Sequence, residues 1–275
     1  MKKLLLRVGL ILFAVSVLAS AATLSVYLSP PGQMSSVIPG VVTEDFNAVA
    51  LLTSSSTTYD SNIGIYTVPN GFRMPVIAAD QYGGANNSQY MYVGSRHAGD
   101  ATTVTLTLDV AANYFGFWWS AGDSKNRMTI YNNGTVLAVF QTSDITSLLA
   151  NNPVVAINGT QYQTSAFKGN PNTGAFHGQD GSEPFSYVNL VALGVTFDKI
   201  VFDNNGSSGF ENDNHSVYTG VVDIPRDFPS FAKVVDVPFV NDPVPEPGTG
   251  ILLGGAFASL LVVRTSYRRV RRAQK

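Results

Sequence analysis

A short acidic stretch holds the densest group of side chains that could do chemistry in this chain. Asp203, Glu211, Asp213 and Asn214 fall within twelve positions, and Asn204 and Asn205 lie between them. Carboxylate and amide oxygens are the ligands that Ca²⁺ prefers. We therefore predict a calcium site made of Asp203, Glu211, Asp213 and Asn214. The spacing differs from the EF-hand register, and the same residue types also form turns and solvated edges, so that second interpretation stays open.

A second group combines aromatic and polar side chains. Trp118 and Trp119 are adjacent, so in a strand they point to opposite faces, and the outward one could stack on a sugar ring. Asp123 and Asn126 follow closely and could supply hydrogen bonds to the same ligand. These four residues are the predicted ligand site, and packing on both faces of the strand is the alternative. Tyr82, Tyr90 and Tyr92 form a further candidate rim in a loop rich in glycine and asparagine.

The residues needed for common catalytic sites are sparse. His97, His177 and His215 are the three histidines, and they form no zinc-binding motif. No Gly-x-Ser-x-Gly nucleophile elbow is present. Paired carboxylates suited to glycoside hydrolysis occur in any acidic β protein. We therefore predict a protein without enzymatic activity, and a polysaccharide hydrolase is the least favoured alternative.

The elements that must position these groups are strands. β-rich or alternating runs occur at 41–46, 90–94, 102–110, 114–119, 127–132, 135–140, 187–193, 195–203 and 217–222. Asn132, Asn133 and Gly134 predict a hairpin turn, because Asn-Gly accepts positive φ values. A short helix is predicted at Ser143–Leu149. The fold class is thus an all-β, antiparallel, jelly-roll-like β-sandwich, with one signal helix before it and one short transmembrane helix after it.

The first residues have the composition of a secretory leader. Lys2, Lys3 and Arg7 precede an apolar run at 8–18, and small residues follow at 19–22. A basic region, an apolar region and a small-residue cleavage site are the three parts of a signal peptide. We expect a signal peptide at 1–22 and a sandwich ectodomain at 23–240.

The last residues join three unlike segments. Pro245, Glu246 and Pro247 end a proline-rich linker at 241–247, where fixed φ angles and missing amide donors hold the backbone extended. An apolar segment at 248–264 follows, predicted to be a short transmembrane helix. The basic tail at 265–275 should stay cytoplasmic by the positive-inside rule.

This order resembles that of the bacterial PEP-CTERM proteins, the substrates of exosortases. The resemblance implies that Pro245, Glu246 and Pro247 are the sorting motif and that exosortase processes the chain there. It also implies transient anchoring in the bacterial inner membrane, followed by display at the cell surface or release outside the cell.

The charge of the delivered domain differs from that of the whole chain. The chain has 17 Lys and Arg against 19 Asp and Glu; three of the basic residues lie in the leader and six in 264–275, which leaves 8 − 19 = −11 for the domain together with its linker at 241–247. An acidic domain of this kind does not bind nucleic acid through a basic face. Cysteine is absent, so disulfides and thiol chemistry are excluded.

The region 113–214 has a second resemblance, to a group of exosortase-dependent surface proteins with a lectin-like β-sandwich. The shared residues are Trp118 or Trp119, Asp123, Ser124, Asn126, Tyr131, Asn132, Gly209, Phe210, Glu211, Asp213 and Asn214. We expect a non-catalytic surface or matrix protein associated with exopolysaccharide or biofilm, with polysaccharide as a partner. A calcium-dependent carbohydrate-binding module is the alternative.

Overall fold

The computed structural model describes residues 23–51, 56–95, 99–204 and 208–240. They belong to one compact unit, Ala22–Asp242. The predicted signal peptide, the linker with Pro245, Glu246 and Pro247, the apolar helix at 248–264 and the basic tail lie outside the described residues. Among the residues that are described, no helix has the length and apolar character needed to cross a membrane.

The domain is all-β, with antiparallel ladders between its strands, as the sequence predicted. One sheet has eight strands in the order β16-β1-β13-β8-β15-β6-β5, and β2 pairs with β15. Its strands are β1 (Thr23–Leu28), β2 (Val42–Glu44), β5 (Val76–Ile77), β6 (Tyr90–Val93), β8 (Tyr114–Ser120), β13 (Ser186–Leu193), β15 (Phe210–Tyr218) and β16 (Ala232–Pro238).

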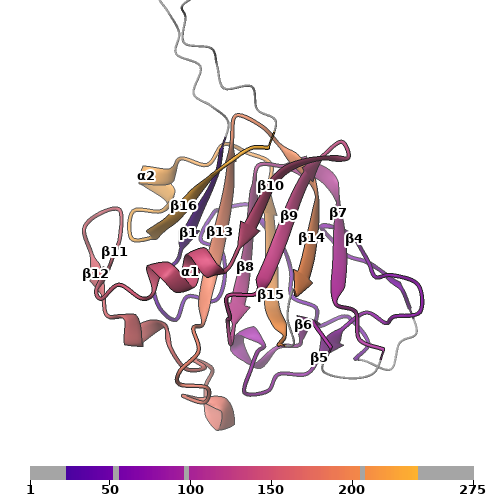
Figure 1. Ribbon diagram of the computed structural model, residues 1–275, viewed down its shortest axis with the longest axis horizontal. Coiled ribbons are helices and arrows are strands. Elements are labelled where there is room, and N and C mark those ends of the chain that lie inside the picture. The colour runs from indigo at the N-terminus through magenta and orange to yellow at the C-terminus, as the bar shows by residue number, and fades with distance from the viewer. Residues whose placement is uncertain (1–22, 52–55, 96–98, 205–207, 241–275) are drawn as a thin grey trace, which may run out of the picture. The chain divides into compact units, whose positions relative to one another are not determined.

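The second sheet has six strands in the order β10-β9-β14-β7-β4-β3, and Figure 1 shows the two sheets as two layers. Its strands are β3 (Thr58–Asp60), β4 (Gly64–Thr67), β7 (Thr103–Ala112), β9 (Asn126–Asn132), β10 (Thr135–Gln141) and β14 (Phe197–Asn204). A separate ladder joins β11 (Val154–Val155) to β12 (Gln161–Tyr162). The helices are α1 (Ser143–Leu148), α2 (Ile224–Asp227) and the 3₁₀ turns η1 (Ala85–Asn87), η2 (Thr164–Phe167) and η3 (Gly174–Phe176).

The hairpin between β9 and β10 has the predicted turn. Asn133 and Gly134 have φ values of 47° and 79°, and Asn132 pairs with Thr135. Two successive residues with positive φ give the turn whose twist matches that of the flanking strands. The turn therefore follows directly from the local sequence.

The main core fills the space between the two sheets. Phe115, Phe117 and Trp119 on β8 pack there with Phe202 on β14 and Phe210 on β15. From Thr103 to Leu108 of β7 the apolar residues are buried and the intervening threonines are exposed or half-buried, which is the alternation expected of a strand with one face in the core. Burial of this apolar surface is the main force that holds the sheets together.

The eight-stranded sheet is covered on its other face as well, so every residue of β8 is buried. Tyr114 packs in a cluster with Tyr27 and Phe228. Trp118 packs in another cluster, with Phe185 and Ala85. Long connections therefore form a third layer over this outer face, and a pocket opens within that layer.

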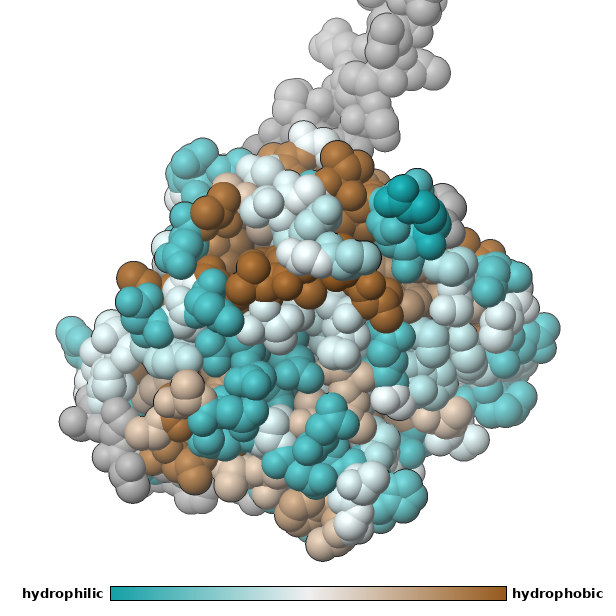
Figure 2. Space-filling model, turned by 180° about the vertical axis from the view of Figure 1, so that it is seen from behind, coloured by the Kyte–Doolittle hydropathy of each residue, from teal (hydrophilic) through white to brown (hydrophobic). Residues whose placement is uncertain are grey.

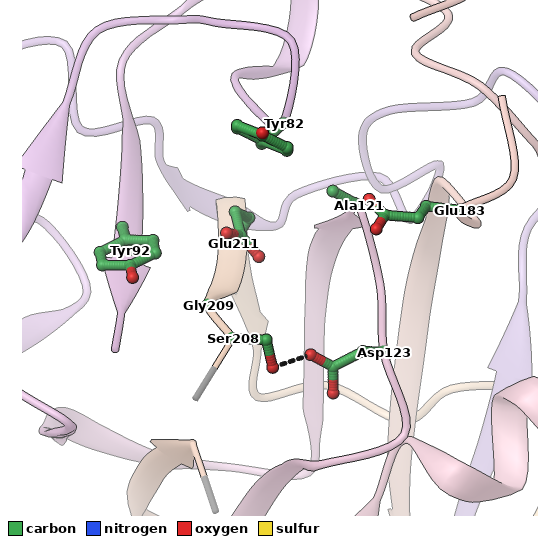
Figure 3. A pocket seen from close by; sticks show the side chains of 8 residues that line it. All are labelled: Tyr82, Tyr92, Ala121, Asp123, Glu183, Ser208, Gly209 and Glu211. Atoms are coloured by element: carbon green, nitrogen blue, oxygen red, sulfur yellow. Dashed lines mark hydrogen bonds between the residues drawn. The ribbon is translucent and has the colours of Figure 1, made fainter. Parts of the chain in front are cut away.

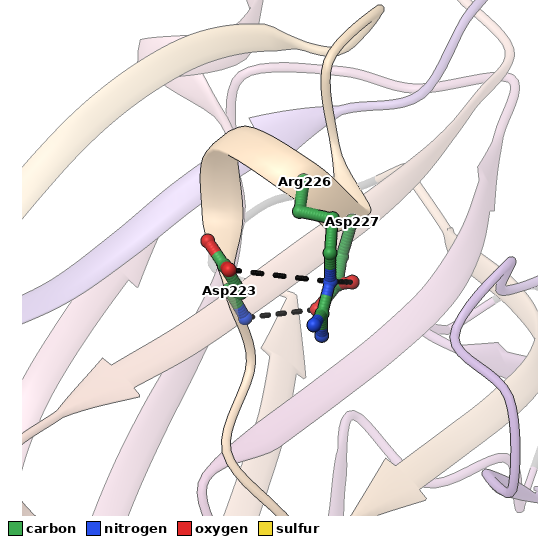
Figure 4. A network of polar contacts seen from close by, with 3 residues as sticks. All are labelled: Asp223, Arg226 and Asp227. Atoms are coloured by element: carbon green, nitrogen blue, oxygen red, sulfur yellow. Dashed lines mark hydrogen bonds and ion pairs between the residues drawn. The ribbon is translucent and has the colours of Figure 1, made fainter.

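The short helix α2 anchors one end of this covering layer. Figure 4 shows its polar contacts: the Asp223 amide donates to Asp227 Oδ2 over 2.8 Å, and Arg226 Nε lies 3.0 Å from Asp227 Oδ1. Arg226 is well exposed, so the ion pair contributes little stability. The buried Phe228 that follows contributes more, because its ring packs against Phe231 with centroids 4.5 Å apart.

The surface mixes hydrophilic residues with limited apolar areas. Figure 2 shows a brown apolar band between hydrophilic areas on the face turned away in Figure 1. Val221 and Val110 are the most exposed of the large apolar side chains in the described residues, at 84% and 64%. Single exposed residues of this kind are normal on a folded domain, and we assign them no role.

Candidate functional site

A pocket of about 320 Å³ opens on the outer side of the eight-stranded sheet. Three acidic and two aromatic side chains dominate its wall. The lining residues are Tyr82, Tyr92, Ala121, Asp123, Glu183, Ser208, Gly209 and Glu211. In Figure 3 the side chain of Glu211 stands in the middle of this group, with the others arranged around it.

Strand register builds the floor of the pocket. Tyr92 on β6 pairs with Glu211 on β15, and Glu211 pairs in turn with Ser120 on β8. Directly opposed residues in neighbouring strands share a face, so these three side chains form a row across the sheet. The same face carries Trp118, two residues before Ser120 on β8, which places the row on the outer side.

Glu211 is the most unusual side chain of the site. It is 6% exposed, and its own backbone amide is the only donor to its carboxylate within the described part of the chain. Burial raises the pKa of Glu211 to about 8, and the negative charges of Asp123, Glu183 and Asp80 act in the same direction. At neutral pH this carboxyl is therefore mostly protonated.

The other two carboxylates come from loops. Asp123, in the β8–β9 connection, accepts hydrogen bonds from the Ser208 hydroxyl and, over 2.6 Å, from the Lys125 amide. Glu183 precedes β13 and is half-buried, and burial followed by the charges of Asp180 and Asp123 raises its pKa. Two loops and one strand thus bring three acidic groups to one cavity.

A second hollow of about 390 Å³ adjoins the first, because Asp123 and Glu183 line both. Its other lining residues are Gly122, Thr146, Leu149, Ala150, Lys168, Ser182 and Pro184. Helix α1 contributes Thr146 to this hollow. The two hollows together can accept a ligand longer than one small ring.

The structure corrects the predicted ligand set. Trp118 and Trp119 do point to opposite faces, but they are 1% and 0% exposed, because the outer face of β8 is covered. Neither ring can stack on an external sugar. Asn126 is also buried, at the start of β9. Of the four predicted residues, Asp123 is the one that lines the pocket.

The predicted calcium ligands do not come together. Asp203 lies in the six-stranded sheet and pairs with Arg127 over 2.6 Å. Asp213 accepts hydrogen bonds from the Ala85 amide and the Ser88 hydroxyl, and burial raises its pKa to about 7.

The Asn214 side chain donates to the Met34 carbonyl over 2.8 Å, so it is also engaged elsewhere. Glu211 is the predicted calcium ligand that lines the pocket. No set of three or more His, Asp or Glu side chains in the described ranges is placed to hold a metal ion. The physical reason is that 210–218 forms an extended strand, which spaces Glu211 and Asp213 along one face, and that Asp203 lies on β14 of the other sheet.

Some pocket residues were visible in the sequence and others were not. Of the three predicted tyrosines, Tyr82 and Tyr92 line the pocket, although Tyr92 on β6 is only 3% exposed. Tyr90 is fully buried, and its hydroxyl donates to Asp80 over 2.9 Å. Glu183 was missed, because no local pattern distinguishes it from other loop carboxylates. Gly209 was named only among the residues shared with the lectin-like surface proteins. In the structure a Cβ at Gly209 would overlap Glu211 Oε1 and the Tyr92 ring.

Comparisons with known proteins give little further information. No protein-family model and no curated protein matches the chain. Among solved structures, a match is found to the catalytic domain of a GH87 alpha-1,3-glucanase in complex with tetrasaccharides. It has 15% sequence identity and a TM-score of 0.33, and it covers 69% of this chain and 30% of that chain.

This match corrects the prediction of a protein without enzymatic activity, because the neighbouring structure is a catalytic domain. That prediction is withdrawn. A TM-score of 0.33 carries no argument for an activity of this chain. Any functional conclusion must therefore come from the pocket itself.

Proposed function

We propose that this chain is an exported bacterial surface or matrix protein whose jelly-roll-like sandwich binds an extracellular polysaccharide through the pocket around Glu211. Exosortase would process the chain at Pro245, Glu246 and Pro247, after transient anchoring by the segment 248–264. The sorting part of the proposal is supported by the sequence pattern, and the binding part by the pocket.

The observation that carries the binding proposal is the combination of groups in one cavity. Saccharides present hydroxyl groups at their edges and C–H groups on their faces, so their sites combine hydrogen-bonding side chains with aromatic rings. Asp123, Glu183 and Glu211 supply the first, and the half-buried Tyr82 supplies the second, while Tyr92, 3% exposed, forms part of the floor. The adjoining hollow, which shares Asp123 and Glu183, favours a chain over a single sugar.

A glycan array probed with the intact exported protein, which contains the domain at 23–240, tests this proposal. We expect binding to a subset of polysaccharide fragments and its loss in Gly209→Ala, because the new methyl group would occupy space beside Glu211 and Tyr92. Val110→Ala, at an exposed position of β7 in the other sheet, is the control, since the Val110 side chain is 64% exposed and lies outside the pocket. Equal binding by Gly209→Ala and the unaltered protein would refute the assignment of this pocket.

The array also distinguishes calcium-independent binding from the alternative, a calcium-dependent carbohydrate-binding module. Binding that disappears with a chelator and returns with Ca²⁺ would favour a calcium-dependent module. Because no three acidic or histidine side chains of the described ranges are grouped for a metal, we expect binding to persist in chelator.

A second candidate function is glycoside hydrolysis in the same pocket, and Glu211 is the observation that favours it. A general acid must be protonated at working pH, which burial achieves by raising the pKa of a carboxyl. Release of reducing ends from a bound polysaccharide, lost in Glu211→Gln, would establish this function. Binding without any release would exclude it for that polysaccharide.

A further inference from the structure

We propose that the polysaccharide recognised by this pocket carries free amino groups, and that a protonated amine of the sugar lies against Glu211 and Glu183. This inference rests on the proposed function and adds the chemical class of the ligand. It follows from the charge of the wall, from the state of Glu211 and from the shape of the site.

The wall of the first hollow is acidic, and no basic side chain among the described residues that line it balances this charge. Asp123, Glu183 and Glu211 contribute carboxyl groups, and none of the lining residues is Lys or Arg. The described ion pairs lie elsewhere, at Arg73–Asp100, Arg127–Asp203, Arg226–Asp227 and Lys233–Asp236. Such a wall attracts a cation and repels uronic acids and sulfated sugars.

Glu211 provides an independent indication of a missing partner. A carboxyl that is more than nine-tenths buried normally has hydrogen-bond or charge partners, because desolvation without them is costly. In the described ranges this carboxylate receives only its own backbone amide, and Figure 3 shows it directed into the cavity between Tyr92 and Asp123. An ammonium group placed there would supply the missing donors.

The raised pKa gives the interaction a measurable signature. Among the described residues, the charged groups that act on Glu211 are Asp123, Glu183 and Asp80, all negative. A bound ammonium group opposes their effect and lowers the pKa of Glu211, so binding below the free pKa of about 8 releases a proton. A neutral sugar has no such effect.

The shape of the site favours an amino sugar over a simple polyamine. The half-buried Tyr82 offers a ring surface on which a sugar face can lie, and the second hollow extends the site along the polysaccharide. Lys168 lines only the second hollow, so the preference for an amine belongs to the first.

The decisive experiment compares two oligosaccharides of one length by calorimetry at about pH 6, where sugar amines carry a proton. One is a glucosamine oligomer and the other is the fully N-acetylated form of the same oligomer. We expect the amine form to bind roughly tenfold more tightly, as one favourable partly buried ion pair allows, and to release a proton. Proton release is read from the dependence of the binding enthalpy on the ionisation enthalpy of the buffer.

Two variants locate the effect. Glu211→Gln keeps the size of the side chain and should remove most of the preference and the proton release. Asp60→Asn removes one charge from the exposed edge strand β3 of the other sheet and should leave both unchanged. Retention of the preference in Glu211→Gln, or its loss in Asp60→Asn, would overturn the assignment to Glu211.

The remaining outcomes separate this inference from the proposed function. Equal affinity for the two oligomers would overturn the amine preference and leave saccharide binding intact. Equal affinity for spermidine and the glucosamine oligomer would overturn the amino-sugar assignment. Binding to neither oligomer, with binding to a neutral glycan on the array, would overturn the inference alone; no glycan binding at all would overturn both.

Discussion

At the scale of single residues, the domain holds ionisable groups at unusual pKa values in its interior. Glu211 and Asp213 lie on the outer face of β15, and burial raises their pKa values to about 8 and about 7. His215 lies in the core, where burial lowers its pKa to about 3 and it stays neutral, hydrogen-bonded to Tyr66 and Asn212. These groups make the stability of the domain depend on pH in opposite directions.

The contribution of Glu211 can be isolated by Glu211→Gln. The folded pKa of about 8 exceeds the ordinary glutamate pKa of 4.5, so the stabilising contribution of Glu211 is full below about pH 4.5 and declines as pH rises toward 8. We therefore expect the melting temperature of the unaltered protein to fall relative to that of Glu211→Gln between pH 5 and 8. Thermal unfolding of both proteins between pH 5 and 8 measures this difference in melting temperature.

Asp213 and His215 are present in both proteins, so their effects cancel in this difference. Asp60→Asn should follow the unaltered protein at every pH. Parallel curves for Glu211→Gln and the unaltered protein would contradict the assigned pKa.

At the scale of elements, β15 shows where local sequence stops being informative. Its residues Glu211–Ser216 are all polar, and the predicted strand began only at Val217. The structure places this stretch beside β8, away from any sheet edge, with one row of side chains facing each side. Hydrogen bonds from distant segments, such as Ala85 to Asp213 and Tyr66 to His215, compensate the burial, and no local pattern reveals such partners.

Other elements were predictable because their signals are local. β7 alternates threonine with apolar residues, the β9–β10 turn has Asn-Gly, and the helix predicted from Ser143 begins there. The pocket depends instead on register between strands far apart in sequence, which pairs Tyr92 with Glu211. The sequence therefore indicated the tyrosines and Asp123 as candidates, but it did not indicate that they line one pocket with Glu183.

The covering layer over β8 leads to a prediction for Trp118. Because this side chain is 1% exposed and packs with Phe185 and Ala85, Trp118→Ala should destabilise the domain by about 3–5 kcal/mol, measured by urea unfolding. Acrylamide should quench the fluorescence of the folded protein weakly, since both tryptophans are buried.

Val110→Ala, on an exposed position of β7, is the control and should change stability by less than about 0.5 kcal/mol. Strong quenching in the folded state, relieved by a saccharide, would contradict burial of the tryptophans and restore the stacking role first predicted for one of them.

At the scale of the whole molecule, charge separates the domain from the segments that flank it. The leader and the tail hold nine of the 17 basic residues, and the rest of the chain has a net charge of −11. An acidic domain stays soluble and avoids anionic surfaces, while it attracts cationic polymers. This distribution agrees with the proposed division between a basic sorting segment and a ligand-binding domain.

The sorting proposal makes a prediction about the mature chain. In a host that contains exosortase, intact-mass analysis of the surface or released protein should find a form without the basic tail at 265–275. Substitution of Pro245, Glu246 and Pro247 by alanine should leave the full tail on a membrane-bound form, because the extended motif is removed. Pro243→Ala, two residues upstream, is the matched control and should be processed normally. A released protein that still carries Arg264 to Lys275 would exclude processing at the motif, and the pocket would then belong to a protein delivered by another route.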